Sequence, residues 1–177
     1  MLSDNRDQTQ YIQYNTYMTT KKTKSIQYWL MKSEPECYSI DDLKRDNVEH
    51  WDGTRNYQVR NMMRDDMQVG DMVLFYHSNT KEIGVVGTMS IVSTAYPDPT
   101  QFDPTSEHPD PKSDPANPRW LCVDVQFQSK FSRTVSLAEI KIDPVFATMP
   151  LVKKGNRLSV MPVVKKHFEK IVKMAGE

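Results

Sequence analysis

Residues 28–35 read Tyr28-Trp-Leu-Met-Lys-Ser-Glu-Pro35, a buried-looking run with an abruptly polar end. Ile26 to Lys32 is short, continuous and rich in aromatic and apolar residues, which predicts a strand inside a sheet. Lys32, Ser33 and Glu34 then supply charge and hydrogen-bonding groups. Because functional side chains gather where the strands of a rigid sheet end, we expect a binding site at this position.

The sequence outside this strand alternates short helix and strand signals. Ser39 with Asp42 forms a capping-box pattern, which predicts a helix that buries Ile40 and Leu43. Other helices are expected at 55–64, at 136–140 as a single turn, and from Pro162 as the first helical residue. Further strands are expected at 72–77, 83–94, 121–127 and 157–160. Since most of these do not alternate as β-α-β, we expect an α+β fold around a small, curved, largely antiparallel sheet with flanking helices.

The chain divides into a leader and one domain. Residues 1–25 are rich in Gln, Asn and Thr and lack an apolar period, so we expect a disordered leader. Residues 26–175 are long enough to bury one core without disulfides. We therefore predict a single domain and expect it to be a monomer.

Composition excludes several classes of protein. The 177 residues carry 23 basic and 23 acidic side chains and are 38% hydrophobic. No apolar run approaches the roughly 18 residues of a membrane span, and no signal-peptide core is present. The two cysteines, Cys37 and Cys122, lack metal-ligand spacing. We expect a cytoplasmic protein with reduced thiols, no metal, no cofactor and no membrane contact.

Charge is distributed unevenly along the chain. Residues 153–177 hold seven basic side chains against two acidic ones, a net of +5. Residues 96–118 hold five acidic side chains against one basic, a net of −4. The basic end could meet phosphates, although a solvated helix face is the commoner explanation of such a run. Residues 97–118 also hold seven of the eleven prolines, which predicts an irregular loop.

Four segments concentrate polar and aromatic side chains: 29–35, 51–57, 75–79 and 155–160. Trp29 lies in an apolar strand, where a tryptophan usually belongs to the core. Trp51 is surrounded by Glu49, His50, Asp52 and Gly53, so few local neighbours could pack it. A ligand-facing Trp51 is as well supported as a core Trp51.

Catalytic signatures are absent from the sequence. It contains no G-x-S-x-G, P-loop, G-x-G-x-x-G or H-E-x-x-H pattern. His77 could act as a base with Ser78 or Glu34 beside it, but a lone histidine at a strand end is more often structural. Binding is therefore better supported than turnover.

The same segments resemble the EVE domain family. The resemblance rests on Tyr28–Pro35, Trp51-Asp-Gly-Thr-Arg-Asn-Tyr-Gln-Val-Arg-Asn61, Gly70-Asp71 with Phe75-Tyr-His-Ser78, Tyr96-Pro-Asp-Pro99, and Arg157-Leu-Ser-Val-Met-Pro162. Together they span about residues 26–174. The resemblance implies a PUA-like pseudo-barrel and a pocket for a modified nucleobase.

The related YTH domains, which read N6-methyladenine, indicate which residues would meet the base. A Lys-Ser step after the first strand and a later tryptophan match Lys32, Ser33 and Trp51 here, whereas Glu34-Pro35 departs from the YTH pattern. The predicted base pocket comprises Trp29, Lys32, Ser33, Glu34, Trp51, Asn56, Tyr76, His77, Ser78 and Ser159. The predicted phosphate contacts are Arg55, Lys153, Lys154 and Arg157.

Three functions follow from these observations. The leading hypothesis is a non-enzymatic module that binds DNA or RNA carrying a modified base. The alternative is a small PUA-like enzyme acting on a nucleoside or amide through His77 and Glu34, which requires these residues and Ser78 to meet around the pocket. A third is a partner-binding protein that uses the proline-rich loop.

Overall fold

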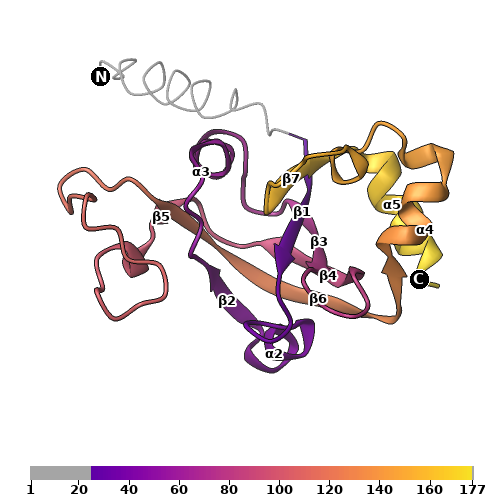
Figure 1. Ribbon diagram of the computed structural model, residues 1–177, viewed down its shortest axis with the longest axis horizontal. Coiled ribbons are helices and arrows are strands. Elements are labelled where there is room, and N and C mark those ends of the chain that lie inside the picture. Colours follow the sequence, from indigo (N-terminus) through magenta and orange to yellow (C-terminus); the bar gives the residue numbers. More distant parts are fainter. Residues whose placement is uncertain (1–24, 177) are drawn as a thin grey trace, which may run out of the picture.

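The computed structural model describes residues 25–176 and contains one seven-stranded sheet (Figure 1). The strand order is β2-β6-β4-β3-β1-β7, and the short β5 pairs with β6. Among the strands of residues 25–176, β1 and β3 pair in parallel and the other pairs are antiparallel. The strands are β1 Tyr28–Ser33, β2 Val48–Trp51, β3 Met72–His77, β4 Gly84–Ile91, β5 Tyr96–Pro97, β6 Leu121–Ser136 and β7 Val160–Val163. The expected α+β, mostly antiparallel fold is confirmed.

The first strand is buried on both faces. Trp29 and Met31 pack in one core cluster with Trp51 and Phe75. Leu30, between them in sequence, points the other way into a second cluster with Leu74, Phe146 and Phe168. Because side chains alternate along a strand, a strand covered on both sides must be apolar at every position, which explains the unbroken run in the sequence.

The helices lie at the periphery of the sheet (Figure 1). They are α2 Ile40–Asp46, α3 Tyr57–Asp65, α4 Leu137–Ile142 and α5 Lys165–Met174, with 3₁₀ turns at Pro99–Gln101, Pro144–Phe146 and Pro150–Val152. Ser39 and Asp42 form the predicted capping box. The second helix begins two residues later than predicted because the side chain of Asn56 caps it.

Several strands differ from the sequence prediction: β6 continues to Ser136 instead of ending at residue 127, and β5 was not predicted. Pro162 was expected to open the last helix, but it lies inside β7, paired with Trp29. A proline is tolerated there because β7 is the edge of the sheet. β2 was not predicted, since its residues Val48, Glu49 and His50 carry little apolar signal.

The loop from residue 98 to 118 projects from one end of the molecule (Figure 1). Its base is tied to Trp120, since Gln101 Nε2 donates to the Trp120 carbonyl at 2.9 Å and Gln101 Oε1 accepts from the Trp120 amide at 3.0 Å. The predicted leader, residues 1–25, lies outside the described residues except for Ser25.

Within residues 25–176, no helix is long and apolar enough to cross a membrane. In the same range, no group of three or more His, Cys, Asp or Glu side chains is arranged to hold a metal ion.

Candidate functional site

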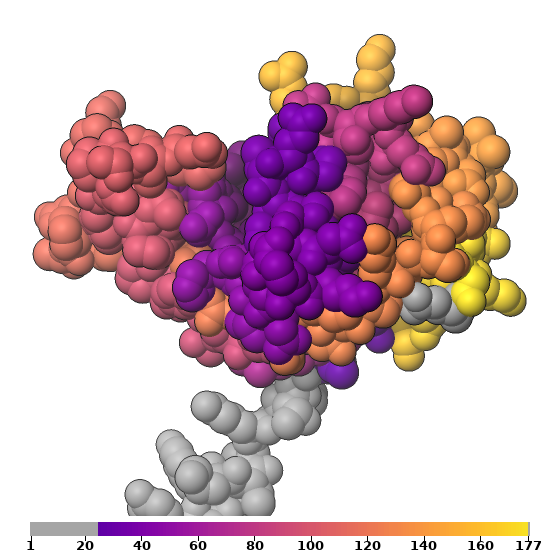
Figure 2. All heavy atoms as spheres, turned by 90° about the horizontal axis from the view of Figure 1, so that it is seen from below, coloured from indigo at the N-terminus to yellow at the C-terminus, as the bar shows by residue number. Residues whose placement is uncertain are grey.

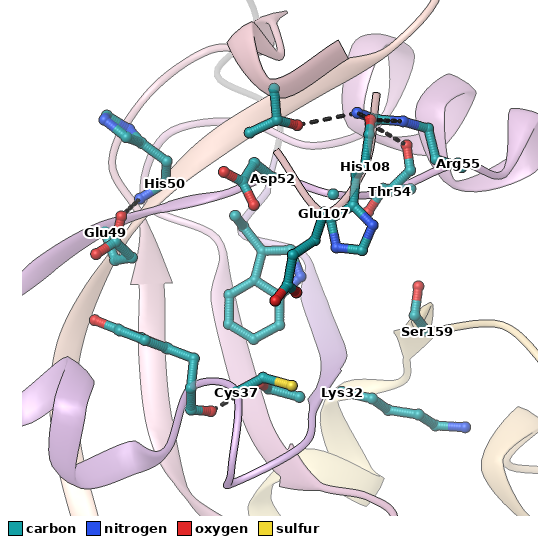
Figure 3. Close-up of a pocket in the computed structure, with 15 residues that line it drawn as sticks. Lys32, Cys37, Glu49, His50, Asp52, Thr54, Arg55, Glu107, His108 and Ser159 are labelled. Carbon is teal, nitrogen blue, oxygen red and sulfur yellow. Dashed lines mark hydrogen bonds between the residues drawn. The ribbon is translucent and has the colours of Figure 1, made fainter. Parts of the chain in front are cut away.

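A pocket of about 550 Å³ opens where β1 and β2 end. This is within the size range of small-ligand sites. Figure 2 shows the surface hollowed between the 98–118 loop and the N-terminal part of the domain. The pocket is lined by Lys32, Ser33, Cys37, Tyr38, Glu49, His50, Trp51, Asp52, Gly53, Thr54, Arg55, Thr100, Glu107, His108 and Ser159 (Figure 3).

Trp51 belongs to both the pocket and the core. Its side chain lines the pocket, yet it is only 9% exposed and packs edge-on against Phe75, with ring centroids 5.4 Å apart. Trp51 therefore combines the two alternatives that the sequence left open: it lines the pocket and it packs in the core. Within the described residues its indole N–H has no hydrogen-bond partner, whereas those of Trp29 and Trp120 donate to carboxylates.

The end of β1 brings Lys32, Ser33 and Ser159 to the pocket, as the sequence predicted. Ser33 Oγ donates to the Tyr38 carbonyl at 2.7 Å, and the Lys32 amide donates to the Ser159 carbonyl at 2.8 Å. Burial lowers the pKa of Lys32. The first contact fixes the end of β1 to the turn that follows it, and the second joins β1 to the residue before β7. The Lys32 ammonium forms no ion pair within the described residues.

Two carboxylates face the pocket without a partner. Figure 3 shows Asp52, from the β2–α3 turn, and Glu107, from the 98–118 loop, near one another in the lining of the pocket. Within the part of the chain described, neither carboxylate accepts a hydrogen bond or forms an ion pair. The pKa of Asp52 is raised by loss of solvent around it and by the nearby Asp98 carboxylate. The pocket therefore offers hydrogen-bond acceptors that protein groups do not use.

The 98–118 loop forms one wall of the pocket through a buried ion pair. Arg55 Nη1 lies 2.7 Å from Asp98 Oδ2, and the Asp98 side chain is fully buried. Arg55 also donates to Thr100 Oγ1 at 3.0 Å and to the His108 carbonyl. Burial opposes ionisation of Asp98, but hydrogen bonds from Thr100 and Arg55 outweigh it and hold the pKa of Asp98 below its usual value.

Gly53 lets the loop approach closely. It has a positive φ of +68°, and a Cβ added there would lie 2.5 Å from Cδ2 of His108. Only glycine fits without strain, so the imidazole of His108 rests directly against the β2–α3 turn.

A polar network borders the pocket beside β2. His50 Nδ1 lies 2.7 Å from Asp124 Oδ1, and the Tyr96 hydroxyl donates to the same oxygen at 2.5 Å. The hydrogen bond to Asp124 raises the pKa of His50. This network ties β2, β5 and β6 together at the pocket rim.

Six residues predicted for the base pocket lie outside its lining. Trp29 and Tyr76 are buried in the core, and Trp29 Nε1 donates to Asp71 at 2.9 Å. Asn56 is occupied as the N-cap of α3. Packing or capping already uses these three side chains, so the structure does not bring them to the pocket.

His77, Glu34 and Ser78 do not assemble into a catalytic group. His77 Nε2 accepts a hydrogen bond from the Ile40 amide at 3.2 Å, and burial lowers its pKa. Glu34 accepts from Asn79 at 2.9 Å, and Ser78 Oγ donates to the Ser33 carbonyl at 3.4 Å. None of the three lines the pocket, so the arrangement that the enzyme alternative required is not formed.

The predicted phosphate contacts divide into two groups. Arg55 was expected to meet a phosphate, but its guanidinium is committed to Asp98 and the loop. Lys153, Lys154 and Arg157 are exposed, and within the described residues none of them forms an ion pair. They lie on the segment that leads to Ser159 at the pocket.

The sequence prediction missed the loop residues Thr100, Glu107 and His108 and the rim residues Cys37, Tyr38, Glu49, His50, Asp52 and Thr54. For Asp52 and His50 a signal existed, because both flank Trp51. For the loop residues no local signal existed.

The domain matches a known protein family over nearly all of its described length. The sequence profile of the EVE domain matches residues 27–174. The chain belongs to the EVE domain family.

Several relatives share this EVE domain over most of its length. Thymocyte nuclear protein 1 of Danio rerio is 42% identical over 172 residues, covering 86% of this chain and 74% of that protein. A crystal structure from Pseudomonas syringae is 44% identical with a TM-score of 0.81, covering 84% of this chain and 99% of the other. Human THYN1, crystallised in complex with DNA containing 5-methylcytosine, is 39% identical with a TM-score of 0.75, covering 85% and 98%.

Proposed function

We propose that this EVE domain is a non-enzymatic module that binds a modified base of DNA or RNA in the pocket over Trp51. The observation that carries the proposal is a pocket that joins an aromatic side chain to hydrogen-bonding groups left without partners. The relative crystallised with DNA containing 5-methylcytosine makes a methylated cytosine in DNA the first ligand to test.

The pocket suits a base taken out of a stack. A base paired in a duplex cannot reach it, so the base must be single-stranded or flipped out at a cost of a few kcal/mol. Contact with an aromatic side chain returns roughly 1–3 kcal/mol per base. The exposed edge of Trp51 and its unpartnered indole N–H provide such a contact. A methyl group adds about 1 kcal/mol of apolar burial, which gives modest discrimination.

The flanking phosphates would be held on one side of the pocket. Lys153, Lys154 and Arg157 are free cations on the segment next to Ser159, while Glu49, Asp52 and Glu107 make the opposite rim acidic. A nucleic-acid strand would therefore run over the basic segment and turn one base toward the pocket. The phosphate contacts would position the strand, and the pocket would select the base.

The proposal also concerns where the protein acts. A module that binds nucleic acid acts where nucleic acid is found: at the nucleoid in the cytoplasm of a bacterium, or in the nucleus of a eukaryote. The vertebrate relatives are named as nuclear proteins.

The test is a titration of matched oligonucleotides, with and without one 5-methylcytosine. The wild type should bind the methylated strand more tightly. Trp51→Phe, which keeps a ring but removes the N–H and part of the aromatic surface, should weaken that binding several-fold. Phe168→Leu, in the second core cluster far from the pocket, controls for loss of stability and should bind as the wild type does. Equal affinity of the wild type for both strands, or wild-type binding by Trp51→Phe, would count against the proposal.

A further inference from the structure

We infer that Asp52 selects bases that carry an exocyclic amino group, so that the pocket accepts a methylated cytosine and rejects thymine. This inference rests on the proposed function and adds the chemistry that decides which base enters. The structural basis is a free carboxylate directed into the pocket from the residue that follows Trp51.

Cytosine and thymine differ in the hydrogen-bonding group at position 4. Cytosine presents an amino group at position 4, which donates hydrogen bonds, whereas thymine presents a carbonyl oxygen there, which only accepts. An ionised carboxylate has no proton to donate. Asp52 can therefore accept a hydrogen bond from the amino group of a cytosine. With a thymine, the carboxylate oxygen would lie against the carbonyl oxygen of the base, and neither atom has a proton to donate. 5-Methylcytosine and thymine carry the same methyl group, so the shape of the pocket cannot distinguish them. The donor or acceptor at position 4 can distinguish them.

Asp52 is distinguished from the other acids of the rim by its surroundings. The Glu49 carboxylate accepts a hydrogen bond from the His50 amide at 2.8 Å. Asp98 is fully buried and bound by Arg55 and Thr100. Asp52 has no partner within the described residues, and it has lost part of its solvent. A donor that enters the pocket thus meets an acceptor for which no protein bond has to break.

Glu107 is the competing candidate for the same role. It also lines the pocket without a partner in the described residues, from the neighbouring 98–118 loop (Figure 3). Both residues are exposed, but the longer side chain of Glu107 loses more rotamer freedom when a ligand fixes it. Asp52 lies on the turn that the His108 ring packs against, next to the aromatic residue of the pocket. We therefore assign the selection to Asp52 and use Glu107 as the comparison.

The experiment compares 5-methylcytosine with thymine at one position of otherwise identical oligonucleotides. The wild type should prefer 5-methylcytosine by about 5- to 150-fold, which is the range expected of one good base-edge contact. Asp52→Asn keeps the shape of the side chain, but its amide can either donate or accept. This variant should bind both bases with affinities within about threefold of one another, chiefly through a gain for thymine.

Two further measurements make the outcome decisive. Glu107→Gln should retain the wild-type preference; if Glu107→Gln loses it while Asp52→Asn keeps it, the assignment to Asp52 is overturned. Equal binding of 5-methylcytosine and thymine by the wild type would overturn the inference and leave the proposed function standing. Absence of binding to either strand would instead remove the proposed function itself. Melting curves of both variants verify that they are folded.

Discussion

Arg55 lies 2.7 Å from Asp98, and this pair joins the β2–α3 turn to the 98–118 loop. The guanidinium is 21% exposed and the carboxylate is not exposed at all. Asp98 also accepts from the Gly53 amide at 3.0 Å and from the Thr100 amide at 2.8 Å. Beside the Gln101–Trp120 contacts, one buried carboxylate therefore holds the pocket wall that carries Glu107 and His108, and it receives its hydrogen bonds from residues of the turn and of the loop itself.

Arg55→Ala should destabilise the domain by about 3–5 kcal/mol, because it leaves the Asp98 carboxylate buried without its counter-ion. The hydrogen bonds from Gly53 and Thr100 place the effect toward the lower end of that range. Urea unfolding followed by circular dichroism measures it. Arg64→Ala is the matched control, since Arg64 pairs with Asp65 at the surface with both side chains about half exposed, and it should cost at most about 1 kcal/mol. Similar losses for the two variants would show that the Arg55–Asp98 pair does not hold the loop.

Trp51→Ala should lower the free energy of unfolding by roughly 3–5 kcal/mol, as truncation of a buried aromatic residue typically does. The reason is its contact with Phe75 inside the first core cluster. Trp51→Phe should lose far less, since a ring remains in the core. Thermal melting of both variants is the measurement. An unchanged melting temperature for Trp51→Ala would mean that Trp51 faces the pocket alone.

These two residues show what the sequence could predict and what it could not. Trp51 was identified because its neighbours are too polar to pack it, and that local argument located the pocket. The same argument could not show that Phe75, which is distant in sequence, packs against the other side of the ring. Arg55 was expected to meet a phosphate because it is a basic residue near the predicted pocket. Its partner Asp98 lies 43 residues later, and only the folded loop brings the two together.

The fold was predictable where the pattern was local. β1 and the capping box of α2 follow from a run of apolar residues and from one pair of side chains. β7 was misplaced because Pro162 is favourable both at the start of a helix and on an edge strand, and only the pairing with Trp29 decides between them. The pocket residues of the 98–118 loop were not predictable because their positions depend on contacts with Arg55 and Gly53.

The His50–Asp124 contact should stabilise the fold in a pH-dependent way. The folded state raises the pKa of His50 above its usual 6.5, so the stabilisation is fully present below that value and is lost as the pH rises through the raised pKa. Glu49 and Asp52 add to the effect of Asp124. His50→Gln should therefore be less stable than the wild type at about pH 5.5, by at most about 1 kcal/mol because the pair is exposed, and nearly equal to it at about pH 8.5.

The measurement is urea unfolding of both proteins at the two pH values. Asp124→Asn should remove the same pH-dependent part, and the double variant should lose no more of it than either single one. A constant difference between wild type and His50→Gln across this range would show that the imidazolium is not stabilised by Asp124.

Replacement of Lys153, Lys154 and Arg157 by alanine should reduce the salt dependence of oligonucleotide binding. Each phosphate contact contributes about 0.7 to the slope of log affinity against log salt for a single strand, so loss of three contacts should flatten the slope by about 2. Titrations at several salt concentrations measure it. Replacement of the exposed Lys141, Lys166 and Lys173 removes the same charge elsewhere and should leave the slope nearly unchanged. Equal slopes for the two triple variants would assign the salt dependence to overall charge.

Gly53→Ala should loosen the pocket wall, and Gly155→Ala provides a matched comparison. Both glycines have a positive φ, +68° and +81°, so alanine is strained at either position by roughly 1–2 kcal/mol. At Gly155 an added Cβ meets nothing within 4 Å, whereas at Gly53 it would overlap the His108 ring. Gly53→Ala should therefore cost more stability than Gly155→Ala. It should also weaken oligonucleotide binding, because displacement of His108 shifts the neighbouring Glu107 and widens the pocket above Asp52.

Melting curves and titrations of the two variants separate backbone strain from this contact. If both variants lose the same stability and Gly53→Ala binds as the wild type does, the contact between Gly53 and His108 does not shape the pocket.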